Sequence, residues 1–211
     1  MRIKGLTKAA LITKIRLDCP WEEPFMKHLI LITSPPASGK TFIAKKLAEA
    51  LGECVYLDKD SVIVLSRRIF EVAGEPFDRS SDFFERNVRD YEYEAIMAIA
   101  LEALDYSSHV LVNAPFNREL RDEEYLRRLR ETLAGKGAKL TVVWVHTDIE
   151  VCHQRMIARG SERDTWKLRN WEEYVASRSF EPPALEGLRI IDNSTDNSYR
   201  AGLQTLLEEL E

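Results

Sequence analysis

A loop that ends in Gly-Lys-Thr carries the clearest chemical signal in the sequence. It reads Ser-Pro-Pro-Ala-Ser-Gly-Lys-Thr over residues 34–41 and follows a run of apolar and β-branched residues. In such a loop Lys40 reaches the β- and γ-phosphates of a nucleotide, and Thr41 offers its hydroxyl to Mg²⁺. Backbone N–H groups at the start of the following helix add donors and a favourable dipole. The pattern predicts a site for ATP and Mg²⁺ whose nucleotide-binding residues are Ala37, Ser38, Gly39, Lys40, Thr41 and Phe42.

The first half of this loop departs from the common G-x-x-x-x-G-K-[ST] pattern. Ser34 stands at the first glycine position, and Pro35 and Pro36 have no N–H to donate. The phosphate donors must therefore come from residues 37–41. Ser34 is expected to avoid the backbone angles that only glycine adopts easily. A tight turn without a ligand is the alternative interpretation of the loop.

Two carboxylates end the second predicted strand. The C-terminal ends of parallel strands share one edge of a sheet, so Asp58 and Asp60 are expected to face the same site as the loop. One of the two can help to hold water on Mg²⁺ while the other accepts a proton from an attacking hydroxyl. The alternative for Asp60 is an N-cap of the next helix.

A cluster of cations follows the fourth predicted strand. Arg155 and Arg159 stand four residues apart, on one face of a predicted helix that breaks at Gly160. The polar, charged residues that follow predict a lid at about 159–170. Arginines delivered by a closing lid can stabilise the charge that develops on a transferring phosphoryl group. Arg159 is the predicted catalytic arginine and Arg155 a nucleotide-binding one, with a solvated basic helix face as the alternative.

These motifs together resemble the small P-loop kinases, a group that includes shikimate kinase, gluconate kinase, chloramphenicol phosphotransferase, zeta toxins and polynucleotide 5′-kinase. The resemblance covers most of residues 28–192 and rests on the loop at 36–41, the Asp-Lys-Asp run at 58–60 and the arginine-rich lid. It implies a parallel sheet of strand order 2-3-1-4-5. It also implies that Asp60 contacts and deprotonates the acceptor hydroxyl, that Asp58 lies near the metal, and that the lid arginines clamp phosphates or stack on adenine. With this resemblance we assign Asp58 and Thr41 to the metal, and Asp60 and Lys40 to catalysis.

Two asparagines at predicted strand ends are further candidates. Asn113 stands where many P-loop proteins place a metal-associated aspartate. A neutral amide cannot replace that charge, so we assign Asn113 to positioning the substrate, with a polar cap of the strand as the alternative. Asn193 stands where related kinases contact the adenine edge, and we assign it to the nucleotide. A helix N-cap explains Asn193 equally well.

The acceptor is expected to contact the region between the second and third strands. Residues 66–93 contain five arginines interleaved with aromatic residues, and Arg79 is the predicted substrate contact among them. Anionic or aromatic acceptors suit this composition. Solvated arginines and core phenylalanines give the same pattern, so the composition does not distinguish a sugar acid, a nucleoside, an antibiotic and an oligonucleotide end.

Alternating β-branched runs and helical patterns must position these residues. Strands are predicted at 28–34, 53–58, 108–113, 139–146 and 188–192, and helices at 40–51, 60–73, 82–105, 118–135, 148–158, 170–178 and 196–210. This alternation predicts an α/β P-loop NTPase fold of three layers, with a five-stranded parallel sheet and helices on both faces. A kinase domain is predicted at 28–211, after an N-terminal extension at 1–27.

Composition narrows the class of protein. The 211 residues carry a net charge of -5 from interspersed charges, so nucleic acid is a possible but unsupported partner. Three scattered cysteines form no CxxC pair, which argues against a disulfide framework or a zinc site. No apolar run is long enough for a transmembrane helix and no secretory signal is visible, which predicts a soluble, cytoplasmic monomer or homodimer.

The sequence therefore predicts an ATP-dependent kinase, a phosphotransferase that acts on an alcohol group of a small-molecule acceptor. A polynucleotide 5′-hydroxyl kinase and a non-catalytic ATP-binding regulatory protein are the alternatives. A GTPase is disfavoured because neither a DxxG nor an NKxD motif is visible at the expected places.

Overall fold

The computed structural model describes residues 26–161, 164–177 and 180–210. Almost all of the predicted extension at 1–27 lies outside the described residues. Within them, five strands form one parallel sheet in the order β2-β3-β1-β4-β5, which confirms the predicted fold. The strands are β1 (Lys27–Thr33), β2 (Val55–Asp58), β3 (His109–Asn113), β4 (Ala138–His146) and β5 (Arg189–Asp192).

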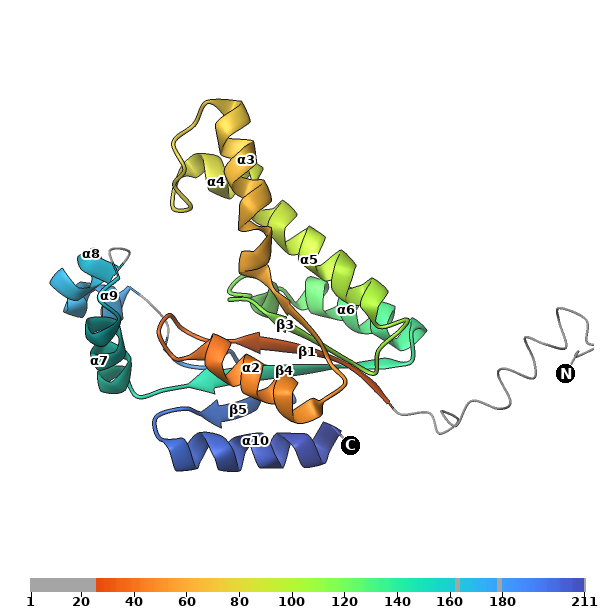
Figure 1. Ribbon diagram of the computed structural model, residues 1–211. Coiled ribbons are helices and arrows are strands. Elements are labelled where there is room, and N and C mark those ends of the chain that lie inside the picture. The colour runs from red at the N-terminus through yellow and green to blue at the C-terminus, as the bar shows by residue number, and fades with distance from the viewer. Residues whose placement is uncertain (1–25, 162–163, 178–179, 211) are drawn as a thin grey trace, which may run out of the picture.

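Helices cover both faces of the sheet (Figure 1). Helices α5 (Arg89–Ala103) and α6 (Glu123–Gly135) pack on one face, and α2 (Lys40–Leu51) and α10 (Asp196–Leu210) on the other. The central strand β1 is buried from His28 onward, as expected for a strand covered on both sides. The remaining helices are α3 (Ile63–Ala73), α4 (Asp82–Asn87), α7 (Ile149–Arg159), α8 (Thr165–Arg169) and α9 (Trp171–Ala176).

Three predicted helices differ in the structure. The predicted helix at 82–105 is two helices, because the backbone leaves helical angles at Val88 (φ -130°). The predicted helix at 60–73 begins with a 3₁₀ turn, η1 (Lys59–Val62). The predicted helix at 118–135 likewise begins with a 3₁₀ turn, η2 (Glu119–Arg121), before Asp122 caps α6 through the N–H groups of residues 124 and 125. Local backbone geometry at Val88, and capping by Asp58 and Asp122, thus interrupt patterns that look continuous in the sequence.

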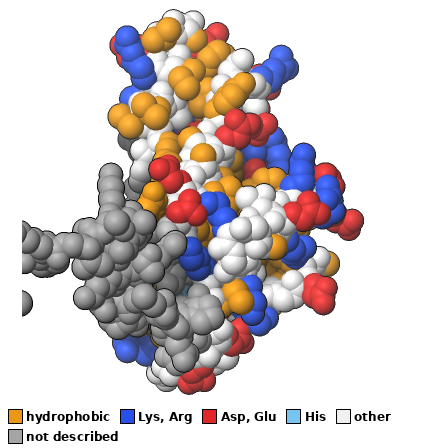
Figure 2. Space-filling view, turned by 90° about the vertical axis from the view of Figure 1, so that its right-hand side faces the viewer, with side chains coloured by type: hydrophobic (Ala, Val, Ile, Leu, Met, Phe, Trp, Pro, Cys, Tyr) orange, Lys and Arg blue, Asp and Glu red, His pale blue; other side chains and the backbone are white. Residues whose placement is uncertain are grey.

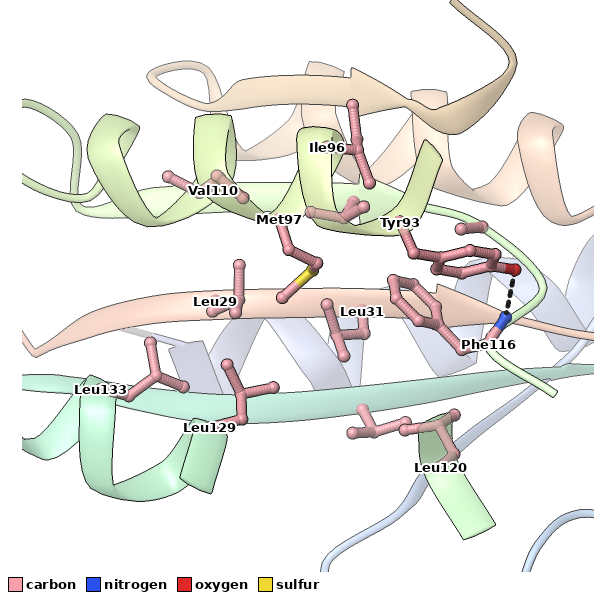
Figure 3. Close-up of a cluster of buried hydrophobic side chains, with 14 of the residues drawn as sticks. Leu29, Leu31, Tyr93, Ile96, Met97, Val110, Phe116, Leu120, Leu129 and Leu133 are labelled. Atoms are coloured by element: carbon pink, nitrogen blue, oxygen red, sulfur yellow. Dashed lines mark hydrogen bonds between the residues drawn. The ribbon is translucent and has the colours of Figure 1, made fainter. Parts of the chain in front are cut away.

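The core beneath α5 and α6 also fixes the loop that follows β3. In Figure 3, Tyr93 of α5 reaches over the sheet, and the backbone N–H of Phe116 donates to its hydroxyl at 3.3 Å. Phe116 is fully buried and has a left-handed backbone (φ 49°). The packing of the aromatic ring holds this strained residue in place, so the chain turns sharply at the edge of the sheet that carries the phosphate loop.

Helix α3 projects away from the sheet together with α4 (Figure 1). Val64, Leu65, Ile69 and Val72 of α3 are exposed. Figure 2 shows hydrophobic side chains gathered over this projecting part. Among the described helices, none is long and apolar enough to cross a membrane.

Candidate functional site

The phosphate loop connects buried β1 to α2, as predicted. Gly39 precedes α2 in a left-handed conformation (φ 79°), and no side chain caps the N-terminal N–H groups of this helix. These N–H groups are therefore available to an anion. A Cβ atom on Gly39 would lie 2.3 Å from Nδ2 of Asn193, so glycine is required by both the backbone angle and the close approach.

Backbone strain in the loop falls on Ala37. It has φ 67°, in the left-handed region, whereas Ser34 has no positive φ, as the sequence led us to expect. A left-handed conformation costs a residue with a Cβ roughly 1 kcal/mol. We did not foresee this strain, because the small size of Ala37 suggested only a close approach of backbone to phosphate.

Two polar side chains brace the loop from β4 and β5. The backbone oxygen of Ser38 accepts hydrogen bonds from Oγ1 of Thr147 at 2.9 Å and from Nδ2 of Asn193 at 2.7 Å. Arg155 donates through Nη2 to the backbone oxygen of Asn193 at 2.8 Å, while its Nη1 is buried and has no partner among the described residues. The structure thus brings Arg155 and Asn193 to the phosphate loop. No motif or spacing in the sequence pointed to Thr147.

Asn113 lies at the centre of a polar network. Its Oδ1 accepts from Nζ of Lys40 at 2.6 Å, and its Nδ2 lies 2.8 Å from Oδ2 of Asp58, 3.1 Å from Oγ1 of Thr41 and 3.2 Å from the hydroxyl of Tyr56. Strand register explains this, because residue 113 pairs with residue 58 of β2 and residue 32 of β1. Lys40, Thr41 and Asp58, which we assigned to phosphate and metal, therefore all contact Asn113.

Burial sets the electrostatics of this network. Burial lowers the pKa of Lys40 to about 8, although Asp58 and Asp60 act in the opposite direction. Tyr56, which sequence reasoning missed, donates to Asp58 at 3.0 Å. Burial and the neighbouring carboxylate raise the pKa of Tyr56 to about 12, so the phenol remains a donor at neutral pH.

The two carboxylates after β2 have different environments. Asp58 accepts the backbone N–H of Asp60 at 3.0 Å, so Asp58 caps η1 and the alternative of an Asp60 cap is not observed at this turn. The side chain of Asp60 is 65% exposed, and its Oδ1 lies 3.5 Å from Nη1 of Arg79. The carboxylate of Asp60 is therefore exposed, and Arg79 is its one long contact among the described residues.

A buried charge cluster supports the turn that carries Asp60. Glu92 of α5 accepts hydrogen bonds from Lys59, from Ser66 at 2.6 Å and from Nη2 of Arg79 at 2.6 Å. Burial favours a raised pKa for Glu92, but the hydrogen bonds from Lys59 and Ser66 and the charge of Arg79 hold this pKa below its usual range. Nothing in the helical pattern distinguished Glu92 from a solvated glutamate.

In the predicted lid region, Arg159 contacts an internal carboxylate. Arg159 ends α7 and donates through Nε to Oδ2 of Asp164 at 2.9 Å; Lys167 donates to the other oxygen at 2.9 Å. Asp164 is fully buried. Within the part of the chain that is described, the hydrogen bonds of Arg159 go to Asp164 alone. Residues 162 and 163 lie outside the described residues.

The sheet order and the phosphate loop define the small P-loop kinase fold. Solved structures with this arrangement include a gluconokinase from Sinorhizobium meliloti 1021 (TM-score 0.52, 23% identity, 88% of this chain and 96% of that chain). A protein from Chloroflexus aurantiacus gives a TM-score of 0.58 at 22% identity, with the same coverage. At these identities the likeness establishes the fold, and it confirms the resemblance found in the sequence.

The chain belongs to the family described as AAA domain, which matches residues 29–183. A curated relative, a UPF0200 protein of Saccharolobus islandicus, is 32% identical over 140 residues, which cover 66% of this chain and 69% of that protein. A UPF0200 protein of Saccharolobus solfataricus matches to the same extent.

Proposed function

We propose that this protein is an ATP-dependent kinase that transfers the γ-phosphoryl group to a hydroxyl of a small molecule. The network of Lys40, Thr41, Asp58 and Asn113 supports the proposal most strongly. It joins the phosphate loop to the ends of β2 and β3, where an ATP terminal phosphate and an acceptor can meet.

Nucleotide binding is assigned to the phosphate loop together with Arg155 and Asn193. The N–H groups of residues 37–41 and the ammonium of Lys40 surround the phosphates, and Phe42, Arg155 and Asn193 complete the nucleotide site. Thr41 and Asp58 fit a Mg²⁺ ion, because both place a hard oxygen within 3.1 Å of the same Asn113 amide nitrogen. Bound there, Mg²⁺ would neutralise charge on the phosphate oxygens.

Asp60 is the proposed general base. Asp58 already accepts from Tyr56, Asn113 and the Asp60 backbone, whereas the Asp60 carboxylate has only a long contact with Arg79. Asp60 takes the proton of the acceptor hydroxyl. The oxygen of that hydroxyl bonds to the γ-phosphorus, and the bond between this phosphorus and the leaving ADP oxygen breaks. Arg159, released from Asp164, would stabilise the charge on the transferring group.

A non-catalytic nucleotide-binding protein is the second candidate. The neutral amide of Asn113 motivates it, since many P-loop proteins place a metal-associated aspartate at this strand end. This candidate predicts ATP binding without transfer.

The test is label transfer from γ-phosphate-labelled ATP with Mg²⁺ and a cell metabolite extract. Lys40→Ala should lose both nucleotide binding and transfer. Lys46→Ala, which removes an exposed lysine of the same helix, should lose neither. Label on a small molecule supports the proposal, and label on an oligonucleotide would make the enzyme a polynucleotide kinase. Tight ATP binding with no labelled product would favour the non-catalytic candidate.

A further inference from the structure

Tyr56 of β2 belongs to the polar network beside the phosphate loop, although no motif pointed to it. Residues two apart in a strand face the same side of the sheet, so Tyr56 and Asp58 share one face. In the parallel register they pair with Leu111 and Asn113 of β3. Helix α2, which follows the phosphate loop, packs on that same face. The hydroxyl of Tyr56 therefore reaches the network from the strand side, opposite the helix that carries the loop residues.

The core beneath α2 anchors the ring of Tyr56. The side chain is partly buried and packs against a cluster that includes Ile43 and Leu47 of α2. Its hydroxyl donates to Oδ2 of Asp58 at 3.0 Å and accepts from Nδ2 of Asn113 at 3.2 Å. Because apolar contacts hold the ring, the hydroxyl has a fixed place from which it binds both polar side chains.

The count of donors and acceptors shows what this hydroxyl adds. The ammonium of Lys40 can only donate, so Oδ1 of Asn113 faces it and Nδ2 faces the carboxylate of Asp58. Nδ2 has two N–H bonds, but oxygens of Asp58, Thr41 and Tyr56 all lie within 3.2 Å of it. The amide therefore cannot donate fully to all three. Tyr56 gives Oδ2 of Asp58 its own donor, whichever oxygens the amide binds.

We infer that Tyr56 is a positioning residue for the metal site: it fixes the orientation of the Asp58 carboxylate beside Thr41 and so raises the affinity for Mg²⁺. The inference rests on the proposed function, in which Thr41 and Asp58 hold the ion. Hydrogen-bond partners orient a metal-binding carboxylate, and their removal typically weakens metal binding about 10- to 100-fold. Orientation matters here because Asn113 is neutral, so the negative charge offered to the ion comes from Asp58.

Nucleotide binding with and without metal tests this role independently of phosphoryl transfer. Calorimetry measures the affinity for the β,γ-imido analogue of ATP in excess Mg²⁺ and in EDTA, and the ratio of the two affinities is the metal coupling. Tyr56→Phe keeps the packed ring and removes the hydroxyl. It should lower the metal coupling about tenfold and change the affinity in EDTA less than about threefold. Tyr125→Phe, which removes a half-buried hydroxyl of α6 on the other face of the sheet, should change neither value.

A double-mutant cycle distinguishes positioning from general support of the fold. Asp58→Asn keeps an oxygen that can cap η1 but removes the negative charge, so it should lose most of the metal coupling. In that background Tyr56→Phe should lower the coupling by less than about twofold, because Tyr56 acts through Asp58. A full additional loss in the double variant would instead show that the two residues act independently.

The outcomes separate this role from the proposed function. Unchanged metal coupling in Tyr56→Phe, an equal loss of affinity in EDTA and in Mg²⁺, or a parent protein whose binding Mg²⁺ does not strengthen overturns the positioning role. None of these results depends on label transfer, so a parent that transfers label remains a kinase. Metal coupling that depends on Tyr56, together with no transfer, supports the positioning role and refutes the kinase.

Discussion

Lys40→Met should stabilise the nucleotide-free protein while abolishing ATP binding. The fall in the pKa of Lys40 from its ordinary 10.5 to about 8 corresponds to about 3 kcal/mol, at about 1.36 kcal/mol for each pH unit. At pH 7 the burial of the charged ammonium therefore lowers the free energy of unfolding by about this amount. Methionine keeps most of the apolar stem but loses the hydrogen bond to Asn113, which offsets about 1 kcal/mol. The net gain in unfolding free energy should be about 1–2 kcal/mol, or several degrees in Tm.

The extra stability of Lys40→Met over the parent protein should decrease as the pH rises. Below about pH 8, Lys40 is charged in both the folded and the unfolded protein, and the full cost of burial applies. Between about pH 8 and 10.5 the folded protein has released this proton and the unfolded chain still binds it, so the parent becomes more stable with rising pH. Lys40→Met has no such proton, and its advantage over the parent therefore shrinks across this window.

Urea unfolding of both proteins from pH 6.5 to 9.5, followed by circular dichroism, measures this difference. Lys46→Met provides the matched control, because Lys46 is an exposed residue of the same helix and its replacement should change stability by less than about 0.5 kcal/mol. A Lys40→Met protein that is no more stable than the parent at pH 7, or an advantage that does not shrink with pH, would refute a buried, disfavoured ammonium.

Three further substitutions test the site. Asp60→Asn should retain ATP affinity, measured by calorimetry, and lose transfer of labelled phosphate at least a hundredfold, as expected for a general base; unchanged turnover would remove Asp60 from catalysis. Gly39→Ala should abolish ATP binding and lower stability by more than the roughly 1 kcal/mol expected of Gly74→Ala, which has a similar left-handed backbone but open space around it; equal losses in urea unfolding would contradict a clash. Glu92→Gln should destabilise by about 3 kcal/mol because it leaves buried cations unpaired, whereas exposed Glu94→Gln should be nearly neutral in the same assay.

The sheet could be predicted because each strand carries its own signal. The runs that end at residues 33, 113, 146 and 192 are short and contain several β-branched residues each, a composition typical of strands in a parallel sheet. Helix boundaries were less accessible. At Val88 the apolar pattern continues across the boundary, and only the backbone geometry shows that one helix ends and the next begins. Asp122 looks like any other polar residue in the sequence, and only its capping hydrogen bonds show that α6 begins there.

The site residues on strand ends could also be predicted, because a shared edge brings them together whatever the intervening sequence. Their partners could not. Glu92 is far from the loop in sequence, and only the packing of α5 against η1 buries it beside Lys59.

The contact between Asn113 and Lys40 explains why an amide suits the end of β3. A carboxylate at this position would pair with Lys40 in the empty site, and a nucleotide phosphate would then have to compete with that ion pair. The neutral Oδ1 holds the ammonium in place at 2.6 Å without cancelling its charge. The low pKa of Lys40 shows that the positive charge is poorly compensated in the nucleotide-free protein. A triphosphate would relieve that cost on binding, so the departure from aspartate is compatible with a phosphate site in which Asp58 alone supplies the carboxylate for the metal.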